Sequence, residues 1–147
     1  MQTKVMKISL GDPKIVAPCG INCGLCRAYV RDRKACPGCR GGCSSKSKSC
    51  LACAIKNCKE LAAAKYQFCF TCARFPCALL LRLDKRYRTK YGVSVLRNLE
   101  RIKAVGVESF VTEEASKWSC PECGSTLCMH KPQCFNCGHT WKVHVAQ

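Results

Sequence analysis

Apolar residues in the middle of the chain recur at the spacing of an α-helix. Positions three or four residues apart carry Val95, Leu99, Ile102 and Val105, so these side chains share one helix face. Ser94 suits the N-cap of this helix, because its hydroxyl can accept a hydrogen bond from a free backbone N–H, and Gly106 suits its end. The pattern predicts a helix between these two residues.

Two more helices are expected on either side of it. The first begins after Pro76 and runs to Tyr91, where Gly92 can adopt the left-handed conformation that ends a helix. The second covers 107–118, with Phe110, Val111 and Trp118 facing inward. We therefore predict a helical middle segment over 78–118.

Before residue 78, cysteines take the place of the regularly spaced apolar residues that build a core. Twelve of the 17 cysteines form four triplets there: Cys19, Cys23 and Cys26; Cys36, Cys39 and Cys43; Cys50, Cys53 and Cys58; and Cys69, Cys72 and Cys77. The residues between them are rich in Gly, Ser, Lys and Arg, so little apolar surface is available to bury. We predict an irregular, partly α-helical domain that folds only when metal holds it. A short helix is expected over 58–66. Residues 1–18 are expected to be a leader or to include a short strand over 14–17.

The cysteines favour metal binding over disulfides. Disulfides need an oxidising compartment, and residues 1–10 lack the apolar stretch of a signal peptide. The total of 17 is odd, and six Cys-x2-Cys pairs have a spacing typical of cytosolic metal or redox thiols. No run of roughly 18 apolar residues predicts a membrane span. We expect a cytoplasmic metalloprotein that does not enter a membrane.

Two Cys-x2-Cys-Gly knuckles near the C-terminus form the most specific motif. Their cysteines are Cys120, Cys123, Cys134 and Cys137, with ten residues between the pairs. The glycine after each pair tolerates the positive φ of a tight turn, and four thiolates fill the tetrahedral coordination of zinc. We predict a zinc ribbon of short β-hairpins that holds structural Zn²⁺. Cys128 is left over: its spacing repeats that of the preceding triplets and allows an alternative ligand, but a partly buried free thiol is favoured. The thiolates are better placed as ligands than His130, His139 and His144.

The twelve N-terminal cysteines do not reveal how they group. They can form three four-thiolate sites that share ligands between triplets, or four three-thiolate sites with an open position. Paired cysteines are typical of zinc, whereas close triplets with a remote fourth cysteine are typical of iron–sulfur clusters. The sequence therefore does not decide between a 4Fe–4S cluster and Zn²⁺ at about three N-terminal sites. The triplet spacing favours at least one cluster.

Positive charge is concentrated in the helical middle segment. The formal net charge is +16, and four sites of about −2 each would reduce it to roughly +8. Residues 78–106 hold eight Lys or Arg against two acids, a net of +6, while 107–147 hold three against four, a net of −1. A basic face over 82–103, with Tyr87 and Tyr91 among its cations, can bind nucleic acid or dock an acidic redox protein. The alternative is a solvated helix face.

No conventional catalytic set is evident in the sequence. Acids are scarce among residues 19–77, and neither a Ser/His/Asp arrangement nor a phosphate-binding glycine loop can be read. Cys19, Cys23 and Cys26 match the spacing of the radical S-adenosylmethionine motif, but the chain is too short for the barrel of such enzymes. The sequence therefore favours a protein that is not an enzyme.

The N-terminal motifs resemble a known family. Residues 17–29 read Ala-Pro-Cys-Gly-x2-Cys-x2-Cys-x-Ala-Tyr, 36–39 read Cys-x-Gly-Cys, 50–58 read Cys-x2-Cys-x-Ile-x2-Cys, and 69–80 read Cys-x2-Cys-x2-Phe-Pro-Cys-x2-Leu. As a set they resemble a domain of unknown function in small cysteine-rich proteins of anaerobic bacteria and archaea, of which some have an extension like 90–137. The resemblance covers 17–80 and implies a cytoplasmic location and metal binding, presumed to be zinc, without a particular activity. Cys43 fits the family pattern least.

We therefore expect three segments: a multi-metal domain over 1–77, a basic helical segment over 78–118 and a zinc ribbon over 119–147. The leading hypothesis is a cytosolic zinc or iron–sulfur protein that carries electrons or serves as an accessory protein. One alternative is an all-zinc basic adaptor that binds RNA, ribosome or a protein partner. The other is an enzyme that uses a 4Fe–4S cluster with an open iron.

Overall fold

A computed structural model describes residues 11–30, 36, 38–39, 55, 68–72 and 74–142. The helix predicted over 58–66 lies outside these residues, and so do Cys43, Cys50, Cys53 and Cys58. Three helices of 11 to 14 residues dominate the described part: α4 (Ala78–Tyr91), α5 (Val95–Val105) and α6 (Val107–Lys117). The three helices predicted for the middle segment are thus confirmed.

The capping residues lie at the helix ends where the sequence predicted them. Gly92 ends α4 in a left-handed conformation, with a φ of 68°. There its backbone N–H bonds a carbonyl at the end of the helix that would otherwise lack a partner. The Ser94 hydroxyl accepts a hydrogen bond of 3.2 Å from the backbone N–H of Arg97 at the start of α5. Gly106, with a φ of 87°, separates α5 from α6. Because these turns are short, consecutive helices stay in contact, and α5 packs against both α4 and α6.

The segment before the first cysteine differs from its prediction. Residues Pro13–Ile15 form a 3-10 helix, η1, in place of the expected strand. The Asp12 carboxylate accepts a 2.9 Å hydrogen bond from the backbone N–H of Lys14, and Pro13 at the first position favours a helical turn. The strand pairing of Val16 is an isolated antiparallel bridge with Asn22.

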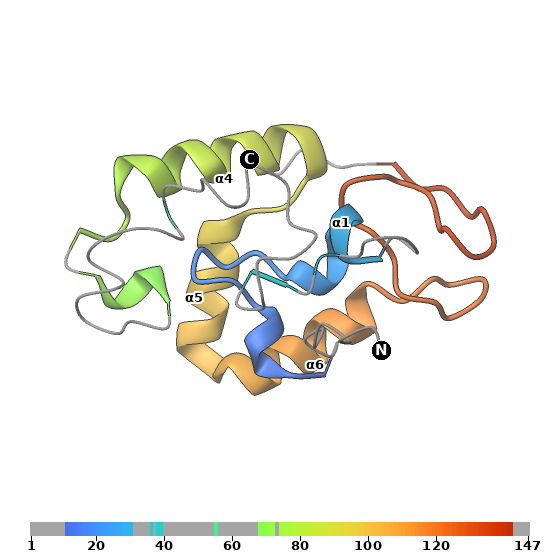
Figure 1. Cartoon of the computed structure of the whole chain (residues 1–147), viewed down its shortest axis with the longest axis horizontal. Helices are drawn as coiled ribbons and strands as arrows, with labels where there is room; N and C mark the ends of the chain where they lie inside the picture. Colours follow the sequence, from blue (N-terminus) through green and yellow to red (C-terminus); the bar gives the residue numbers. More distant parts are fainter. Residues whose placement is uncertain are drawn as a thin grey trace, which may run out of the picture.

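The described cysteine-rich residues fold into short turns. They are the 3-10 helices η2 (Cys23–Leu25) and η3 (Cys69–Thr71) and the single helical turn α1 (Arg27–Val30). The chain is therefore a small, mostly helical, cysteine-rich protein with few strand pairings in its described part. Figure 1 shows α4 along one side of the molecule, with α5 running across it.

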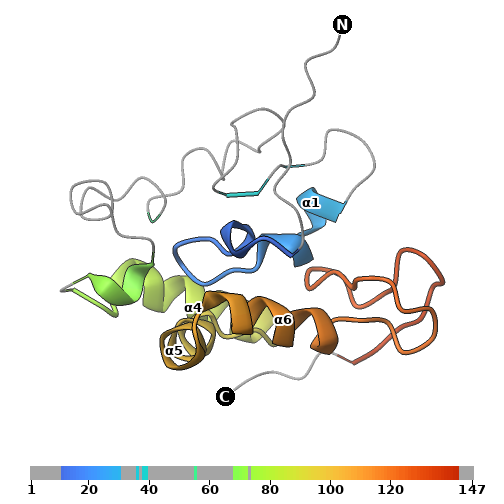
Figure 2. The same ribbon diagram turned by 90° about the horizontal axis from the view of Figure 1, so that it is seen from below.

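One apolar core joins the N-terminal turns to the helices. Ile15 and Val16 are fully buried, and they belong to the same cluster as Leu80, Val95 and Leu99. Figure 2 shows the N-terminal segment lying over the layer of α4, α5 and α6. The cysteine-rich part contributes Tyr29, Ile55 and Phe68 to this core, more apolar surface than its composition predicted, and η1 and the helices supply the rest.

Residues 118–142 form a separate lobe with a smaller core. Leu127, Cys120 and Cys134 are buried there, with Trp118 and Trp141 packed against them. The lobe extends from the end of α6 at one end of the molecule, as both ribbon views show (Figures 1 and 2). Phe110 and Val111 of α6 face inward as predicted, whereas Trp118 is half-buried. Across the described part of the chain, no helix combines the length and the apolar character needed to span a membrane.

Candidate metal centre

The two knuckles of the C-terminal lobe have the same backbone geometry. In each, the first cysteine donates its N–H to the carbonyl five residues later, Cys120 to Ser125 at 2.8 Å and Cys134 to His139 at 2.7 Å. The glycine after each second cysteine returns an N–H to the carbonyl of the first cysteine, at 2.8 and 2.9 Å. These glycines, Gly124 and Gly138, have φ values of 78° and 83°. Only a residue without a side chain adopts this conformation easily, so the glycines make both turns tight.

Isolated antiparallel bridges flank the two turns. One pairs Ser119 with Thr126, and the other pairs Gln133 with Thr140. Each pairing lies one residue before the first cysteine and two after the glycine of its knuckle, so the turns are closed at their bases. Both knuckles point their thiols into the space between them.

The four thiols of the knuckles meet as one group. The sulfur atoms of Cys120, Cys123, Cys134 and Cys137 all lie within 4.8 Å of one another. The Sγ–Sγ distance is 3.6 Å between Cys120 and Cys137, and 3.7 Å between Cys123 and Cys134. Both close pairs join one knuckle to the other. Four sulfur ligands in such a group can bind a metal ion.

Local hydrogen bonds and neighbouring thiols move the pKa values of these cysteines in opposite directions. Hydrogen bonds from the Asn136 and Ser125 side chains and from the Ser125 backbone lower the pKa of the Cys123 thiol to about 5. For Cys137, the backbone hydrogen bond from His139 lowers the pKa, but partial desolvation and the other three thiols raise it more, to about 12. Thiols this close cannot all ionise without a cation, because like charges repel.

The eight described N-terminal cysteines do not form so compact a group, although several of them are neighbours. Cys19 interacts electrostatically with Cys23, Cys39 and Cys69, so three of the four triplets contribute to this neighbourhood. The backbone N–H of Cys39 lies 3.4 Å from the Cys23 sulfur. Among the residues that the structure describes, the C-terminal set alone brings three or more such ligand atoms within 4.8 Å of one another.

Burial raises the pKa of the innermost of these thiols. It raises the pKa of Cys23 to about 12, with a smaller opposing effect from the Cys39 backbone. Burial likewise raises the pKa of Cys19 well above its usual value. Cys69, Cys72 and Cys77 line one side of a small apolar cavity of about 30 Å³. Cys36 is buried and Cys26 half-buried.

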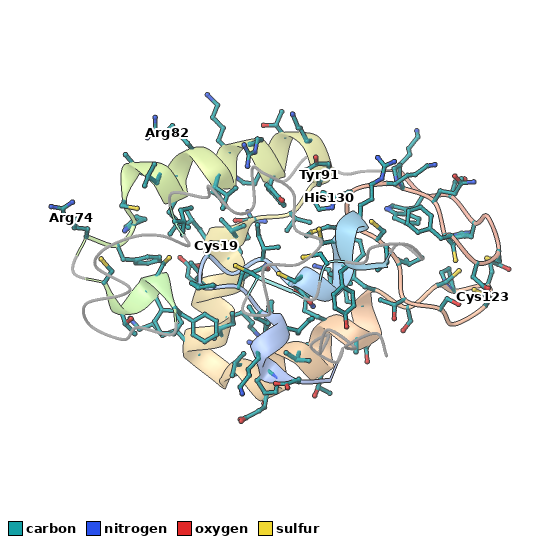
Figure 3. The ribbon with its side chains drawn as sticks, in the orientation of Figure 1. Cys19, Arg74, Arg82, Tyr91, Cys123 and His130 are labelled. Carbon is teal, nitrogen blue, oxygen red and sulfur yellow. The ribbon has the colours of Figure 1, made fainter. Side chains whose placement is uncertain are left out.

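Cys128 and His130 do not belong to the four-thiol group. Cys128 is a free thiol, 2% exposed, on the segment that joins the two knuckles. The next residues contact the N-terminal part: Met129 donates its N–H to the Leu25 carbonyl at 2.9 Å, and His130 Nδ1 accepts from the Arg27 N–H at 3.0 Å. Figure 3 shows His130 beside Tyr91 of α4. The sequence offered His130 only as a weak ligand candidate, because no local pattern reveals a contact across 103 residues.

Four of the five basic residues of α4 are exposed, while its one acid faces inward. Asp84 is 3% exposed and accepts hydrogen bonds from the Ser94 hydroxyl at 2.7 Å and from the Leu96 backbone at 3.2 Å. It also pairs with Arg88 at 2.7 Å. Arg82, Lys85, Arg86 and Lys90 are exposed. The outer face of α4 is therefore positive.

Comparison of the chain with protein-family models, curated proteins and solved structures found no match. The resemblance of residues 17–80 to a family stays a prediction. The fold and the site define a small, mostly helical, cysteine-rich protein with a four-cysteine group that can bind a metal.

Proposed function

We propose that this chain is a zinc-binding adaptor protein. Cys120, Cys123, Cys134 and Cys137 hold one structural Zn²⁺ in a lobe of the zinc-ribbon type, and the basic helical body docks an acidic partner. The observation that carries the proposal is the convergence of four thiols within 4.8 Å at the facing sides of two equivalent knuckles.

The sulfur separations fit a single ion. Zinc binds thiolate at about 2.3 Å, so neighbouring sulfurs of a regular tetrahedron lie about 3.8 Å apart. The cross-knuckle distances of 3.6 and 3.7 Å are close to that value. A 4Fe–4S cluster places a cube of iron and sulfide between its four ligands, which requires a wider spacing. The geometry supports one tetrahedral ion here.

The residues of the lobe suit a structural role for that ion. Hydrogen bonds to the sulfur of Cys123 from Ser125 and Asn136 stabilise its thiolate. A metal with four protein thiolates has no open position for water or substrate, which is the arrangement of structural zinc sites. The ion supplies cross-linking of the two knuckles, and Leu127 with the two tryptophans supplies a small core around them.

The N-terminal cysteines support further metal binding, in zinc or iron–sulfur form. Cys19, Cys23, Cys39 and Cys69 come from three triplets and interact electrostatically, which favours sites that share ligands between triplets. A second candidate function follows from this neighbourhood: an electron-carrying or accessory iron–sulfur protein of a reducing compartment such as the cytoplasm. The resemblance to a cysteine-rich family points to metal binding as well.

The adaptor function is favoured by the charge of α4. Its single acid is turned inward onto Ser94 and Leu96, so the exposed cations of its outer face have no carboxylate from the same helix among them. Such a face attracts polyanions or acidic protein surfaces.

Metal analysis of protein prepared without oxygen tests the proposal. The wild-type chain is compared with Cys137→Ser, which removes one ligand of the group, and with the matched control Cys128→Ser, which changes a cysteine outside it. We expect Cys137→Ser to hold one zinc fewer per chain and Cys128→Ser to keep the wild-type content. The zinc assignment would be overturned if Cys137→Ser lost iron and sulfide in place of zinc, or if it lost no metal at all. Iron and sulfide in all three proteins would support clusters at the N-terminal cysteines.

A further inference from the structure

An open groove runs between the C-terminal lobe and the ends of α4 and α6. It has a volume of about 460 Å³ and includes Tyr91, Trp118, His139 and Trp141 along its walls. This volume is within the range of about 300–1,000 Å³ that is usual for ligand sites. The groove lies outside the four-cysteine group, although it shares the lobe that the metal holds together.

The walls of the groove are aromatic and partly open to solvent. Trp118, His139, Trp141 and Tyr91 are all half-buried, so part of each side chain is accessible to solvent. The His139 and Trp141 rings are nearly parallel, with an interplanar angle of 26° and centroids 6.4 Å apart. Tyr91 contacts His130 edge to face, at 4.8 Å between ring centroids. The rings are therefore held in place before a ligand arrives.

The charges on the groove are of one sign. Lys117 and Lys142 are among the residues that line it, and the described lining contains no aspartate or glutamate. Both lysines are exposed, and the Lys117 ammonium lies 6.0 Å from the centre of the Trp118 ring. Tyr91 is the last residue of α4, so the positive outer face of that helix leads to the groove.

Aromatic rings combined with lysines, without acids, form the surface that binds unpaired nucleic acid. Bases stack on aromatic side chains irrespective of sequence, and cations beside them hold the phosphates. A proline-rich peptide also docks in aromatic grooves, but it offers no phosphates for Lys117 and Lys142. In a double helix the faces of the bases are covered by neighbouring bases, so they cannot stack on the aromatic rings of the groove.

We infer that this groove binds a single-stranded segment of nucleic acid, with bases stacked on Trp141 and its neighbouring rings and phosphates paired with Lys117 and Lys142. The inference rests on the proposed adaptor function and names its partner. It adds a base-stacking groove to the basic helix, which alone can attract any polyanion.

Fluorescence offers a direct test, because the chain has two tryptophans and both line the groove. Zinc-loaded full-length protein is titrated with twelve-nucleotide oligo(U) and oligo(dT), with the matching duplex and with a proline-rich peptide. We expect both single strands to quench the tryptophans at a concentration at which the duplex and the peptide do not. Comparison of oligo(U) with oligo(dT) separates RNA from DNA as the preferred strand.

Two variants separate the contribution of base stacking to the affinity from that of phosphate pairing. Trp141→Leu should weaken single-strand binding about tenfold at every salt concentration, because a base loses its stacking partner. Lys142→Ala should weaken it at low salt and reduce the slope of log affinity against log salt by about 0.7, the value for one phosphate contact on a single strand.

Matched controls come from an aromatic residue and a lysine of the same lobe that do not line the groove. Phe135 is 52% exposed and Lys131 lies 5.9 Å from its ring centre, so the pair repeats the aromatic-lysine chemistry outside the groove. Phe135→Ala and Lys131→Ala should leave affinity and salt slope unchanged. Each variant is analysed for zinc, so that a lost lobe is recognised, and Lys142→Ala remains a test if Trp141→Leu loses its metal.

Wild-type affinity in both Trp141→Leu and Lys142→Ala would overturn the inference, and so would quenching by the peptide alone. Equal losses in the Phe135 and groove variants would also overturn it, since binding would then be a general surface property. None of these outcomes alters the zinc content of the wild-type protein, so the metal assignment is decided separately.

Discussion

His130 accepts a 3.0 Å hydrogen bond through Nδ1 from the backbone N–H of Arg27. A neutral imidazole that accepts at Nδ1 carries its proton on Nε2, which lies 3.2 Å from the Tyr87 hydroxyl. Burial and the nearby Arg27 charge lower the pKa of His130, which keeps the ring neutral. One side chain of the C-terminal lobe thus joins the N-terminal turns and α4.

Replacing His130 with alanine removes two hydrogen bonds and the ring contacts with Tyr87 and Tyr91. We expect His130→Ala to lower the free energy of unfolding by about 1–3 kcal/mol, measured by denaturant titration at pH 7. Tyr87→Phe keeps the ring and loses one hydrogen bond, so its effect should be smaller, about 0.5–1.5 kcal/mol. Equal stability of His130→Ala and wild type would mean that this contact does not hold the lobe.

Gly20 approaches α5 too closely for any side chain. A methyl group there would lie 2.8 Å from the Val95 carbonyl oxygen and 2.9 Å from Leu99 Cγ, at a φ of +92°. Gly20→Ala should therefore cost about 2–5 kcal/mol through strain and overpacking, measured as a fall in unfolding free energy.

The matched control for that substitution is Gly106→Ala. Gly106 also has a positive φ, +87°, but nothing lies within 4 Å of the added methyl group. The backbone strain alone should cost about 1–3 kcal/mol. If the two variants lose the same stability, the close approach of Gly20 to α5 is not the cause.

Asp84 links the stability of the helices to acidity. Burial raises its pKa, but hydrogen bonds from Ser94, Leu96 and Arg88 lower it more, so the folded pKa lies below the usual 3.8. A carboxyl with a depressed folded pKa stabilises the fold above its unfolded pKa, and the benefit is lost as pH falls through the folded value. Asp84→Asn should thus be less stable than wild type at pH 7, with the difference shrinking below about pH 3.8. Denaturant titrations of both proteins across this range check the trend, and a gap independent of pH would contradict it.

Loss of the C-terminal metal should unfold one lobe and spare the helices. Both tryptophans belong to the small core around Cys120 and Cys134, whereas the core of α4, α5 and α6 is a separate cluster. In Cys137→Ser we expect red-shifted tryptophan emission, because the indoles become solvated, with most of the far-ultraviolet helical signal retained. Cys128→Ser should keep the wild-type emission. Loss of the helical signal in Cys137→Ser would show that the two cores fold as one unit.

The helices could be predicted because their information is local. Val95, Leu99 and Ile102 recur at helical spacing, and Ser94 and Gly106 are suited to the ends of such a segment. The strand expected over 14–17 was wrong for an equally local reason: the Asp12 side chain and Pro13 favour a 3-10 turn, which outweighs the β propensity of Ile15 and Val16.

The C-terminal site could be predicted from the sequence only in part. Two Cys-x2-Cys-Gly knuckles predict which thiols converge, because each turn aims its pair at a common point. The spacing does not predict what surrounds them. The groove between Tyr91 and Trp141 is formed by residues 50 positions apart in the sequence, and no periodicity connects them.

The sequence by itself determined the three helices, their caps and the set of four cysteines, since hydrophobic spacing, capping chemistry and knuckle turns act over a few residues. Only the tertiary structure decided that η1 shares a core with the helices, that Asp84 turns inward and that His130 docks on Arg27. These depend on which surfaces meet when the chain folds back on itself, and burial and hydrogen bonding between distant segments are set by that packing alone.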